Sequence, residues 1–272
     1  MNVAQRVAIV TGGGGGIGSA LVARLAREGA RVVVADLDAE SARAVSERVN
    51  ADHPESTVSA GADVSETAQI QELIALAEST FGPVDLYFAN AGIAGAPRLD
   101  ASEQEWDLSI DVNLRAHIRA ARLLVPRWLK RDEGYFVSTA SAAGLLTQIG
   151  SATYAVTKHA AVAFAEWLSV TYGDRGVRVS CLCPMGVNTR MLSAGEDSGD
   201  ALGRAATRAV TSAGDVLDPA EVADSVLAAI EDERFLILPH EDVLEMYRQK
   251  GSDYDRWLRG MRRYQSSLLA QP

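Results

Sequence analysis

The stretch Thr11-Gly12-Gly13-Gly14-Gly15-Gly16-Ile17-Gly18 decides the fold that we predict for this chain. It follows an apolar, β-branched run at 7–11 and opens a segment of helical periodicity at 17–28. Glycines at such a turn let the backbone bend tightly and approach a pyrophosphate, which accepts hydrogen bonds from amides at the helix N-terminus. A flexible loop is the alternative. The lack of a Gly-Lys-Ser or Gly-Lys-Thr ending disfavours a nucleoside-triphosphate loop.

Short β-branched runs alternate along the chain with longer segments of helical periodicity. The expected strands lie at 7–11, 31–36, 57–61, 84–89, 135–139 and 177–183, with a seventh at 235–239. The expected helices lie at 17–28, 38–50, 66–81, 103–131 and 151–172. This alternation predicts an α/β fold, a doubly wound (Rossmann) parallel seven-stranded sheet with helices on both faces, in one domain over 1–272. Ligands of such a sheet bind outside the carboxyl ends of its strands.

The pattern changes in the last third of the chain. The segment 190–215 is rich in Gly, Ala, Ser and charge without strong periodicity, and we interpret it as a substrate lid with some helix. Asp218, Pro219 and Glu221 form a helix start. The segment 240–272 is expected to be a helical C-terminal extension whose aromatic residues serve packing.

Charge and composition exclude several classes of protein. The chain carries 36 acidic and 26 basic residues, a net charge of −10, and no basic patch, so binding to nucleic acid is not expected. No apolar run reaches the roughly 20 residues of a membrane span, and no secretion signal opens the chain. We therefore expect a cytoplasmic protein.

The four histidines and two cysteines lack the spacing of metal ligands, so no metal site is expected. Cys181 and Cys183 stand two residues apart in an expected strand. We expect their side chains on opposite faces of that strand, as buried free thiols that do not bridge.

Asp36 ends the second expected strand, 24 residues after Gly12. A carboxylate there can accept hydrogen bonds from the adenosine ribose hydroxyls, although an aspartate that closes a strand is often only a helix cap. A 2′-phosphate would face this carboxylate, and neither Leu37 nor 13–15 supplies a cation to compensate. NAD is therefore expected in preference to NADP, while Arg43 keeps NADP open.

Tyr154 and Lys158 stand four residues apart in an expected helix, so they share one of its faces. A free phenol has a pKa near 10 and is a weak base at neutral pH. An ammonium about 4 Å away, at an effective dielectric of about 20, favours the phenolate by roughly 4 kcal/mol. The pair thus predicts general acid–base catalysis. Taken alone, the Tyr-x-x-x-Lys spacing occurs by chance in many proteins and favours a packed tyrosine beside a solvated lysine.

Together these motifs resemble those of the short-chain dehydrogenase/reductase (SDR) family over about 5–190, through 11–18, Asn90-Ala91-Gly92, Asn113, Ser141 and 154–158. Ser141 precedes Tyr154 by 13 residues, as the family's serine precedes its tyrosine. The resemblance implies that Tyr154 exchanges the hydroxyl proton, Ser141 holds the substrate oxygen and Lys158 binds the nicotinamide ribose. It also implies that Asn113 holds a water that continues the proton path.

The same resemblance implies a cofactor site built from the turns at several strand ends. Its expected members are Gly12, Gly16, Ile17, Gly18, Asp36, Leu37, Asp63, Val64, Asn90, Ala91, Gly92, Tyr154, Lys158, Pro184, Val187 and Thr189. Asp63 and Val64 would lie beside the adenine and Thr189 near the nicotinamide carboxamide. Each is otherwise a turn residue at a strand end.

Two departures from the family's pattern bear on substrate and assembly. Met185 stands where the family more often has glycine, and the expected substrate pocket consists of Ser141, Leu145, Ile149, Tyr154, Met185 and Leu192. This set favours an apolar alcohol or ketone, while Arg190 is placed to meet a carboxylate. The family's common glycine-pair ending is missing. Helices matching 103–131 and 151–172 pair between subunits in related proteins, so a homodimer or homotetramer is expected, with close packing on the sheet as the alternative.

The sequence therefore predicts an oxidoreductase that transfers a hydride between NAD and a secondary alcohol or its ketone, with Tyr154 as general acid and base. One alternative is an NADP-dependent carbonyl reductase. Another is a non-catalytic, nucleotide-binding regulatory protein of the same fold. A Rossmann-type methyltransferase would leave Tyr154 and Lys158 without a task.

Overall fold

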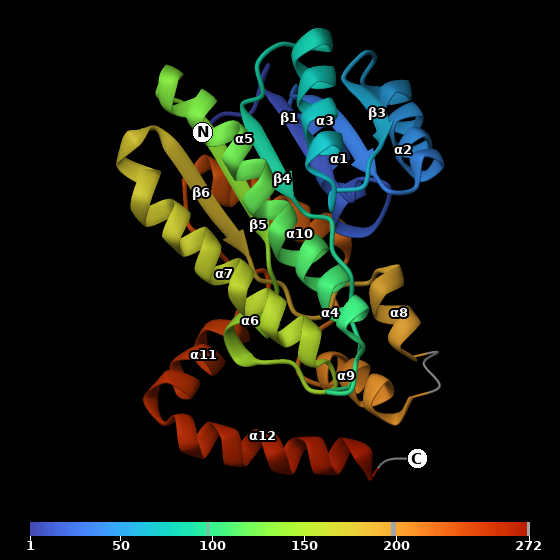
Figure 1. Ribbon diagram of the computed structural model, residues 1–272, viewed down its shortest axis with the longest axis vertical. Coiled ribbons are helices and arrows are strands. Elements are labelled where there is room, and N and C mark those ends of the chain that lie inside the picture. The colour runs from blue at the N-terminus through green and yellow to red at the C-terminus, as the bar shows by residue number, and fades with distance from the viewer. Residues whose placement is uncertain (97, 197–199, 271–272) are drawn as a thin grey trace.

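A seven-stranded parallel sheet forms the centre of the computed structural model, which describes residues 1–96, 98–196 and 200–270 (Figure 1). The strand order is β3-β2-β1-β4-β5-β6-β7, so the direction of winding reverses between β1 and β4. The strands are β1 (Val7–Thr11), β2 (Arg31–Asp36), β3 (Thr57–Gly61), β4 (Leu86–Ala89), β5 (Gly134–Thr139), β6 (Val177–Leu182) and β7 (Leu236–Ile237). The predicted doubly wound sheet is confirmed. Its carboxyl edge at the reversal point is where such folds bind ligands.

Helices cover both faces of the sheet. They are α1 (Gly16–Arg27), α2 (Ala39–Asp52), α3 (Thr67–Thr80), α4 (Glu103–Ile110), α5 (Ala116–Arg131), α6 (Ala143–Leu146), α7 (Ala152–Tyr172), α8 (Arg190–Glu196), α9 (Ala201–Thr211), α10 (Pro219–Glu231), α11 (Asp242–Ser252) and α12 (Tyr254–Leu269), with the π-helix η1 (Asp111–Arg115) and the 3-10 turn η2 (Gly173–Arg175).

Two apolar cores lie on the two faces of the sheet, because successive strand residues point to opposite sides. Ile9 and Val33 belong to the core under α3, α5 and α7. Val10 and Val34 belong to the core under α1, α2 and α10. The strands are buried on both faces, which is why they appear in the sequence as continuous apolar runs.

The segment predicted as a helix, 103–131, is helical over its whole length, but the π-helix η1 interrupts its α-helical geometry between α4 and α5. A π turn holds one extra residue, so the side chains on either side of it change their angular position. Asn113 lies inside this turn and is fully buried. The interruption thus turns Asn113 inward, toward the sheet and α7.

The prediction that the two cysteine side chains point to opposite faces of the strand is wrong. Residues two apart in a strand point to the same face. The Sγ atoms of Cys181 and Cys183 are 3.8 Å apart, and both side chains belong to the core under α7. Both are buried free thiols.

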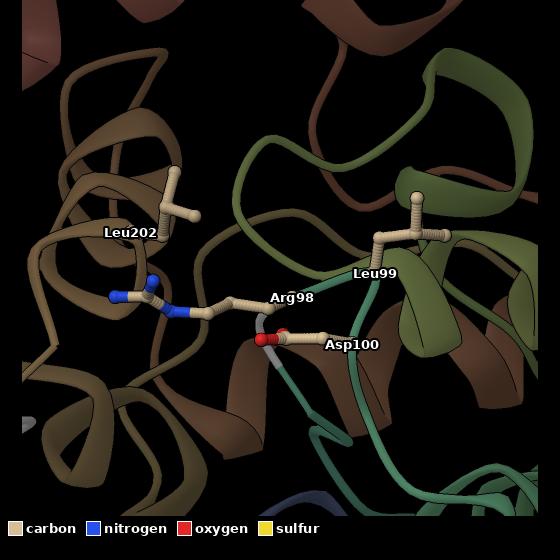
Figure 2. Close-up of a pocket in the computed structure, with 4 residues that line it drawn as sticks. All are labelled: Arg98, Leu99, Asp100 and Leu202. Carbon is tan, nitrogen blue, oxygen red and sulfur yellow. The ribbon is translucent and has the colours of Figure 1, made fainter.

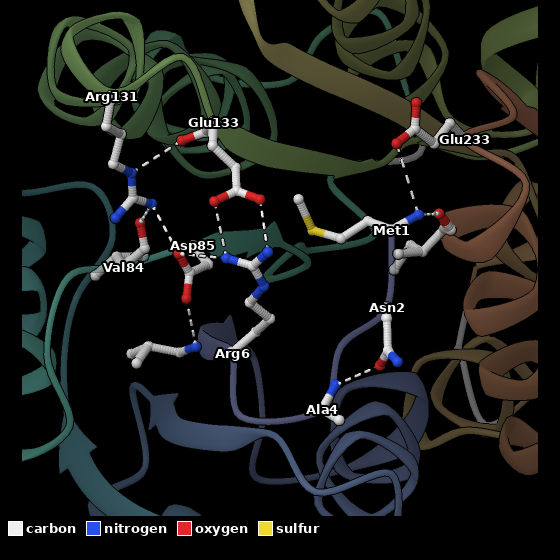
Figure 3. A network of polar contacts seen from close by, with 11 residues as sticks. Met1, Asn2, Ala4, Arg6, Val84, Asp85, Arg131, Glu133 and Glu233 are labelled. Carbon is white, nitrogen blue, oxygen red and sulfur yellow. Dashed lines mark hydrogen bonds and ion pairs between the residues drawn. The ribbon is translucent and has the colours of Figure 1, made fainter.

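A polar network joins the amino ends of the strands, at the edge away from the ligand-binding edge (Figure 3). Asp85 accepts a hydrogen bond from the amide of Val7 at 2.9 Å and pairs with Arg131 at 3.0 Å. Arg6 forms two hydrogen bonds with the carboxylate of Glu133 at 2.8 and 2.6 Å. The network fixes the chain just before β1, β4 and β5.

Four helices in the last third of the chain, α8, α9, α11 and α12, lie outside the sheet layers (Figure 1). Within the expected lid, α8 and α9 are helical, and 197–199 lie outside the described residues. The expected start of α10 is confirmed as a capping box of Asp218 and Glu221. In the expected extension, α11 contacts α6 and α12 contacts α9, while 271–272 lie outside the described residues. Among the described helices, none combines the length and apolarity needed to cross a membrane.

Candidate active site

The glycine-rich turn between β1 and α1 leaves no room for side chains. A Cβ on Gly12, which has φ +64°, would lie 2.9 Å from Cα of Ala91, and a Cβ on Gly18 would lie 2.0 Å from the carbonyl oxygen of Gly12. Gly16 also has a positive φ, +50°. No side chain caps the N-terminus of α1 at Gly15, so the amides of the first turn have no side-chain acceptor there. This turn can bring an anion against the helix N-terminus.

Asp36 lies directly beside this turn. Its Oδ2 atom accepts a hydrogen bond from the amide of Gly14 at 2.9 Å, and its Oδ1 atom accepts one from the amide of Asp38 at 3.1 Å. The helix cap of α2 is Asp38, not Asp36. The neighbouring Leu37 is 76% exposed. The structure thus holds the Asp36 carboxylate at the edge of the glycine turn, with Leu37 open to solvent.

The residues around the turn fit a dinucleotide. Glycines occupy positions where a Cβ would strike backbone, uncapped amides point outward, and a carboxylate stands at the end of β2. Asn90 fastens this region to β1 by donating from Nδ2 to the carbonyl of Thr11 at 2.9 Å. The next residues, Ala91 and Gly92, run on from it, and Gly92 lies near Asn113 and Lys158.

The remaining expected cofactor residues lie on neighbouring loops. A Cβ on Gly16 would be 3.0 Å from Cγ2 of Thr189, so the loop after β6 reaches the glycine turn. Val187 in this loop forms a bridge with Leu217. Asp63 and the buried Val64 follow β3, and Asp63 caps a local turn by accepting from the amide of Ser65 at 2.8 Å.

Sequence reasoning assigned Arg190 to a substrate carboxylate and missed its position at the glycine turn. Its Nη2 atom lies 3.1 Å from the place of a Cβ on Gly15. The guanidinium also contributes to lowering the pKa of Asp38, after the hydrogen bonds from Ser41 and Glu40. Arg43, the cation considered from the sequence, instead pairs with Glu40 and Glu47 on α2. The local sequence gives no sign of this arrangement, because Arg190 is far from Gly15 along the chain.

Ser141, Tyr154 and Lys158 meet at the carboxyl end of β5. Ser141 follows this strand, and its Oγ atom accepts a hydrogen bond from the amide of Ala143 at 3.1 Å. Tyr154 and Lys158 share one face of α7, with Nζ of Lys158 5.5 Å from the centre of the Tyr154 ring. The Ser141 hydroxyl is near enough to the Tyr154 hydroxyl to lower the pKa of that phenol. All three residues therefore face the same small volume.

The hydrogen-bond partner of the Lys158 ammonium is a backbone carbonyl and not the Tyr154 hydroxyl. Its Nζ atom donates to the carbonyl oxygen of Thr139 at 2.9 Å. Burial lowers the pKa of Lys158 to about 8, against a smaller opposing effect of Cys181 and Cys183. Burial is the largest influence on the pKa of Tyr154 and raises it, while the neighbouring Ser141 hydroxyl acts in the opposite direction.

Asn113 connects the π-helix to the other catalytic candidates. Its Oδ1 atom accepts from the amide of Ile93 at 2.9 Å, and its Nδ2 atom donates to the Ile93 carbonyl at 3.0 Å and to Oγ1 of Thr157 at 3.2 Å. Thr157 precedes Lys158 on α7. The Asn113 side chain thus joins the loop after β4 to α7, where its partner Thr157 is the neighbour of Lys158 in the sequence.

One turn after Asn113, His117 is buried behind the site. Its Nδ1 atom forms a hydrogen bond with Oγ of Ser138 at 2.9 Å, while Nε2 has no partner among the described residues. Burial, together with the charge of Lys158, lowers the pKa of His117 to about 3. The imidazole is therefore neutral at physiological pH.

An apolar cavity of about 100 Å³ lies between the loop after Ser141, α9 and the C-terminal helices. Ile149 and Met185, two of the expected substrate residues, line it. Leu145 instead packs into the core, and Leu192 lies on α8 outside the cavity lining. Met246, Trp257 and Met261 from α11 and α12 also line the cavity, and no motif in their helices marks them in the sequence.

A second, shallow hollow lies at the edge of α9 (Figure 2). Arg98, Leu99, Asp100 and Leu202 line it, and Leu99 is 86% exposed. The Nε atom of Arg98 donates to Asp200 at 2.8 Å, which ties the loop after β4 to the start of α9. This hollow contains none of the catalytic candidates.

Comparison with known proteins defines the class of the chain. Its residues 6–200 match the family model described as short chain dehydrogenase. The chain belongs to the short-chain dehydrogenase/reductase family, whose members are oxidoreductases that use NAD or NADP.

Individual relatives agree with this assignment. The chain is 36% identical to the 1-deoxy-11-beta-hydroxypentalenate dehydrogenase of Streptomyces avermitilis over 89% of its own length and 87% of the relative's. A short-chain dehydrogenase/reductase from Burkholderia phymatum, solved in complex with NAD, superimposes with a TM-score of 0.84 at 31% identity, covering 94% of this chain and 96% of that one. Levodione reductase superimposes with a TM-score of 0.78 at 26% identity, covering 86% and 96%.

Proposed function

We propose that the protein transfers a hydride reversibly between NAD and a secondary alcohol or its ketone, with Tyr154 as general acid and base. The observation that carries this proposal is the convergence of Ser141, Tyr154 and Lys158 beside a glycine turn that fits a dinucleotide. The Streptomyces avermitilis relative is named as a dehydrogenase of a hydroxypentalenate, which supports the same reaction type.

Each catalytic side chain has a distinct task. Ser141 donates a hydrogen bond to the substrate oxygen and keeps it beside the Tyr154 hydroxyl. Tyr154 takes the hydroxyl proton during alcohol oxidation and returns it during ketone reduction. When bound, the nicotinamide ring accepts or supplies the hydride. Lys158 holds the cofactor's ribose and brings positive charge toward the phenol, which favours the phenolate. Asn113 orients a water on the path by which the proton leaves.

Lys158 must change partner to perform this task. Its ammonium now donates to the Thr139 carbonyl, which lies at the carboxyl end of β5 within the site. The flexible four-carbon side chain of Lys158 allows the ammonium to turn from this carbonyl to the ribose. The pKa of about 8 means that a large part of the Lys158 population is charged at neutral pH. A ribose hydroxyl is a neutral acceptor, so it can replace a carbonyl at no cost in charge.

NAD is the cofactor that Asp36 supports. Its carboxylate can accept hydrogen bonds from the two hydroxyls of the adenosine ribose, and it repels a phosphate esterified to the 2′-hydroxyl. Arg190 is the opposing feature, since a guanidinium over Gly15 attracts phosphate of any kind. An NADP-dependent carbonyl reductase is therefore the second candidate. We assign Arg190 to the pyrophosphate, which both cofactors share.

The expected assembly and organisation belong to the same proposal. We place the chain in the cytoplasm as one domain, with 190–215 acting as substrate lid and 240–272 as an extension that closes the pocket. Along α7, Val156, Ala163, Trp167 and Val170 form an exposed apolar stripe spaced seven, four and three residues apart. This spacing puts them on one helix face, and it supports a homodimer or homotetramer built through α7. Light scattering of the purified protein tests this directly, and a monomer overturns it.

The proposed reaction is tested with a panel of secondary alcohols and their ketones, each supplied with NAD or NADP and followed by the absorbance of the reduced nicotinamide. Turnover with at least one alcohol or ketone, at higher kcat/KM with NAD, is the expected result. Turnover only with NADP would favour the reductase. Tight NAD binding without any turnover would favour the regulatory protein.

A further inference from the structure

Thr153, the residue before Tyr154, joins α7 to the loop 90–96 that follows β4. Its side chain is fully buried, and its Oγ1 atom accepts a hydrogen bond from the amide of Ala96 at 2.9 Å. The same hydroxyl donates to the carbonyl oxygen of Ala96 at 3.4 Å. The first turn of α7 is therefore fastened to a loop that is distant from it in the sequence.

The loop 90–96 lies directly against Thr153. Gly95 has φ +70°, and a Cβ on it would lie 2.1 Å from Oγ1 of Thr153, so only glycine fits at this contact. Ser151, the N-cap of α7, donates from Oγ to the carbonyl oxygens of Ala94 at 3.0 Å and Ala96 at 3.2 Å. Three successive loop residues therefore follow the start of α7 closely.

A second attachment lies one helical turn further along α7. Asn113 binds the amide and the carbonyl of Ile93, at 2.9 and 3.0 Å, and donates to Oγ1 of Thr157 at 3.2 Å. Thr153 and Thr157 are four residues apart, so they share one face of the helix. The tyrosine and lysine of the candidate site each follow one of these threonines directly, about 100° round the helix. The loop 90–96 is therefore bound along the face of α7 that adjoins the catalytic face.

Tyr154 needs such support because it lies in the first turn of α7. The first amides of a helix have no partner within it, and helix ends fray. The cap bond from the Tyr154 amide to Oγ of Ser151 is long, at 3.4 Å. Attachment at Thr157 alone would leave the first turn free to shift, whereas Thr153 fixes it at a second point. The hydroxyl of Thr153 therefore bears on where the Tyr154 ring lies.

The placement of Tyr154 matters because the reacting groups come from separate elements. Tyr154 lies on α7, Ser141 follows β5, and the expected cofactor residues 90–92 open the loop 90–96. A misplacement of about 1 Å in such a site lowers the rate by about 100-fold. Thr153 joins two of these elements, the catalytic helix and the loop 90–96.

We propose that Thr153 is a positioning residue. Through its bond to the Ala96 amide, it fixes the first turn of α7 against the loop 90–96 and so places the Tyr154 hydroxyl for proton transfer. Thr153 acts through Tyr154 and does not itself move the proton. The proposal rests on the proposed function, because it takes Tyr154 as the group that moves the proton. It adds a determinant of kcat that is separate from the binding of alcohol or NAD.

The test removes the Thr153 hydroxyl and measures hydride transfer. In Thr153→Val, which keeps the branched shape of the side chain, kcat is expected to fall about 10- to 100-fold. The KM for the alcohol and the dissociation constant for NAD should stay nearly the same. Deuterium on the reacting carbon of the alcohol should slow this variant more than the wild type, because hydride transfer then limits turnover. Thr153→Ser keeps the hydroxyl and should recover most of kcat, and a Thr153→Ser variant as slow as Thr153→Val overturns the proposal.

Thr57→Val is the matched control. Thr57 is also buried, and its Oγ1 atom donates to the carbonyl of Ser46 at 3.1 Å. It lies on the edge strand β3, and three strands separate β3 from β5. Both variants should lower the free energy of unfolding in urea, but only Thr153→Val should change kcat and the isotope effect. An equal loss of kcat in both variants would show a general effect of stability and would overturn the positioning role.

Fluorine NMR of protein labelled with 3-fluorotyrosine follows Tyr154 without turnover, and its signal is assigned by its loss in Tyr154→Phe. If the wild type turns over no alcohol or ketone, but Thr153→Val shifts this signal and Thr57→Val does not, the positioning role holds and the proposed function fails. If substrates turn over but Thr153→Val keeps the wild-type kcat or an unshifted signal, the positioning role is overturned and the proposed function stands. An inactive wild type with an unshifted signal in Thr153→Val overturns both.

Discussion

The Nζ atom of Lys250 on α11 donates a hydrogen bond to the carbonyl oxygen of Leu145 on α6, 2.6 Å away. It also lies 3.4 Å from Nε2 of His159, whose Nδ1 atom bonds to the Ala155 carbonyl at 2.8 Å. Lys250 is only 4% exposed. The C-terminal extension is therefore fastened to α6, whose Ala143 and Leu146 line the apolar cavity.

Replacing Lys250 should weaken this attachment. Lys250→Met keeps most of the buried stem but leaves the Leu145 carbonyl without its donor, so the free energy of unfolding is expected to fall by about 1–3 kcal/mol. We also expect a higher KM for the alcohol with little change in kcat, because α6 shapes the cavity and not the proton path. Urea titration and steady-state kinetics measure both effects. Lys130→Met, at an exposed position of α5, is the control, and equal KM values in the two variants would contradict the assignment.

Asp36 should determine the choice of cofactor. Asp36→Ala removes an acceptor for the ribose hydroxyls and the repulsion of a 2′-phosphate, so NAD affinity is expected to fall about 10-fold or more while NADP affinity rises or holds. Calorimetric titration with both cofactors measures the two dissociation constants. Glu40→Ala, which removes a nearby exposed carboxylate paired with Arg43, should leave their ratio unchanged. A ratio that does not shift in Asp36→Ala would remove this residue from cofactor recognition.

Arg190 should act on the phosphates that NAD and NADP share. Arg190→Gln is expected to weaken both cofactors by a similar factor, about 10-fold at low salt, and the difference should shrink as ionic strength rises. Adenosine, which lacks phosphate, should bind equally to both proteins. Arg122→Gln at an exposed site of α5 is the control. A loss confined to NADP would place the guanidinium at the 2′-phosphate instead.

His117 should make the fold sensitive to acid. Its pKa is about 3 in the folded protein, below the value of about 6.5 of a free histidine, so only the unfolded chain takes up a proton between these values. Stability is therefore complete above pH 6.5 and falls as the pH drops toward 3, by up to about 1.4 kcal/mol per pH unit from this group. His117→Gln should flatten that slope. Denaturant titrations at pH 7, 6, 5 and 4 compare the proteins, and parallel slopes would refute the assignment.

Much of the fold was predictable because the sheet is buried on both faces. The runs that became β1, β2 and β4 were recognisable as apolar segments, and the glycine turn fixed where the first crossover begins. The π-helix was not predictable, since Asp111–Arg115 contains no glycine or proline that would mark a break. Pro126, which would suggest one, lies within α5 instead.

Some residues of the candidate site were recognisable in the sequence, and others only in the folded chain. Ser141, Tyr154 and Lys158 follow a fixed spacing, so the sequence could identify them. Arg190 and Trp257 are far along the sequence from the residues they adjoin, and only the folded chain brings them to the glycine turn and to the cavity lining. The bond of Lys158 to the Thr139 carbonyl was not predictable either. The four-residue spacing from Tyr154 places Lys158 on a helix face but does not determine its hydrogen-bond partner.

The central claim is that Tyr154 moves the proton during hydride transfer, and Tyr154→Phe tests it most directly. The variant keeps the ring that packs below Lys158 and loses only the hydroxyl. With the best alcohol of the panel, kcat is expected to fall by about 100- to 10,000-fold, while the dissociation constant for NAD, measured by calorimetry, stays nearly the same. A variant that binds NAD normally and oxidises the alcohol at close to the wild-type rate would contradict the account.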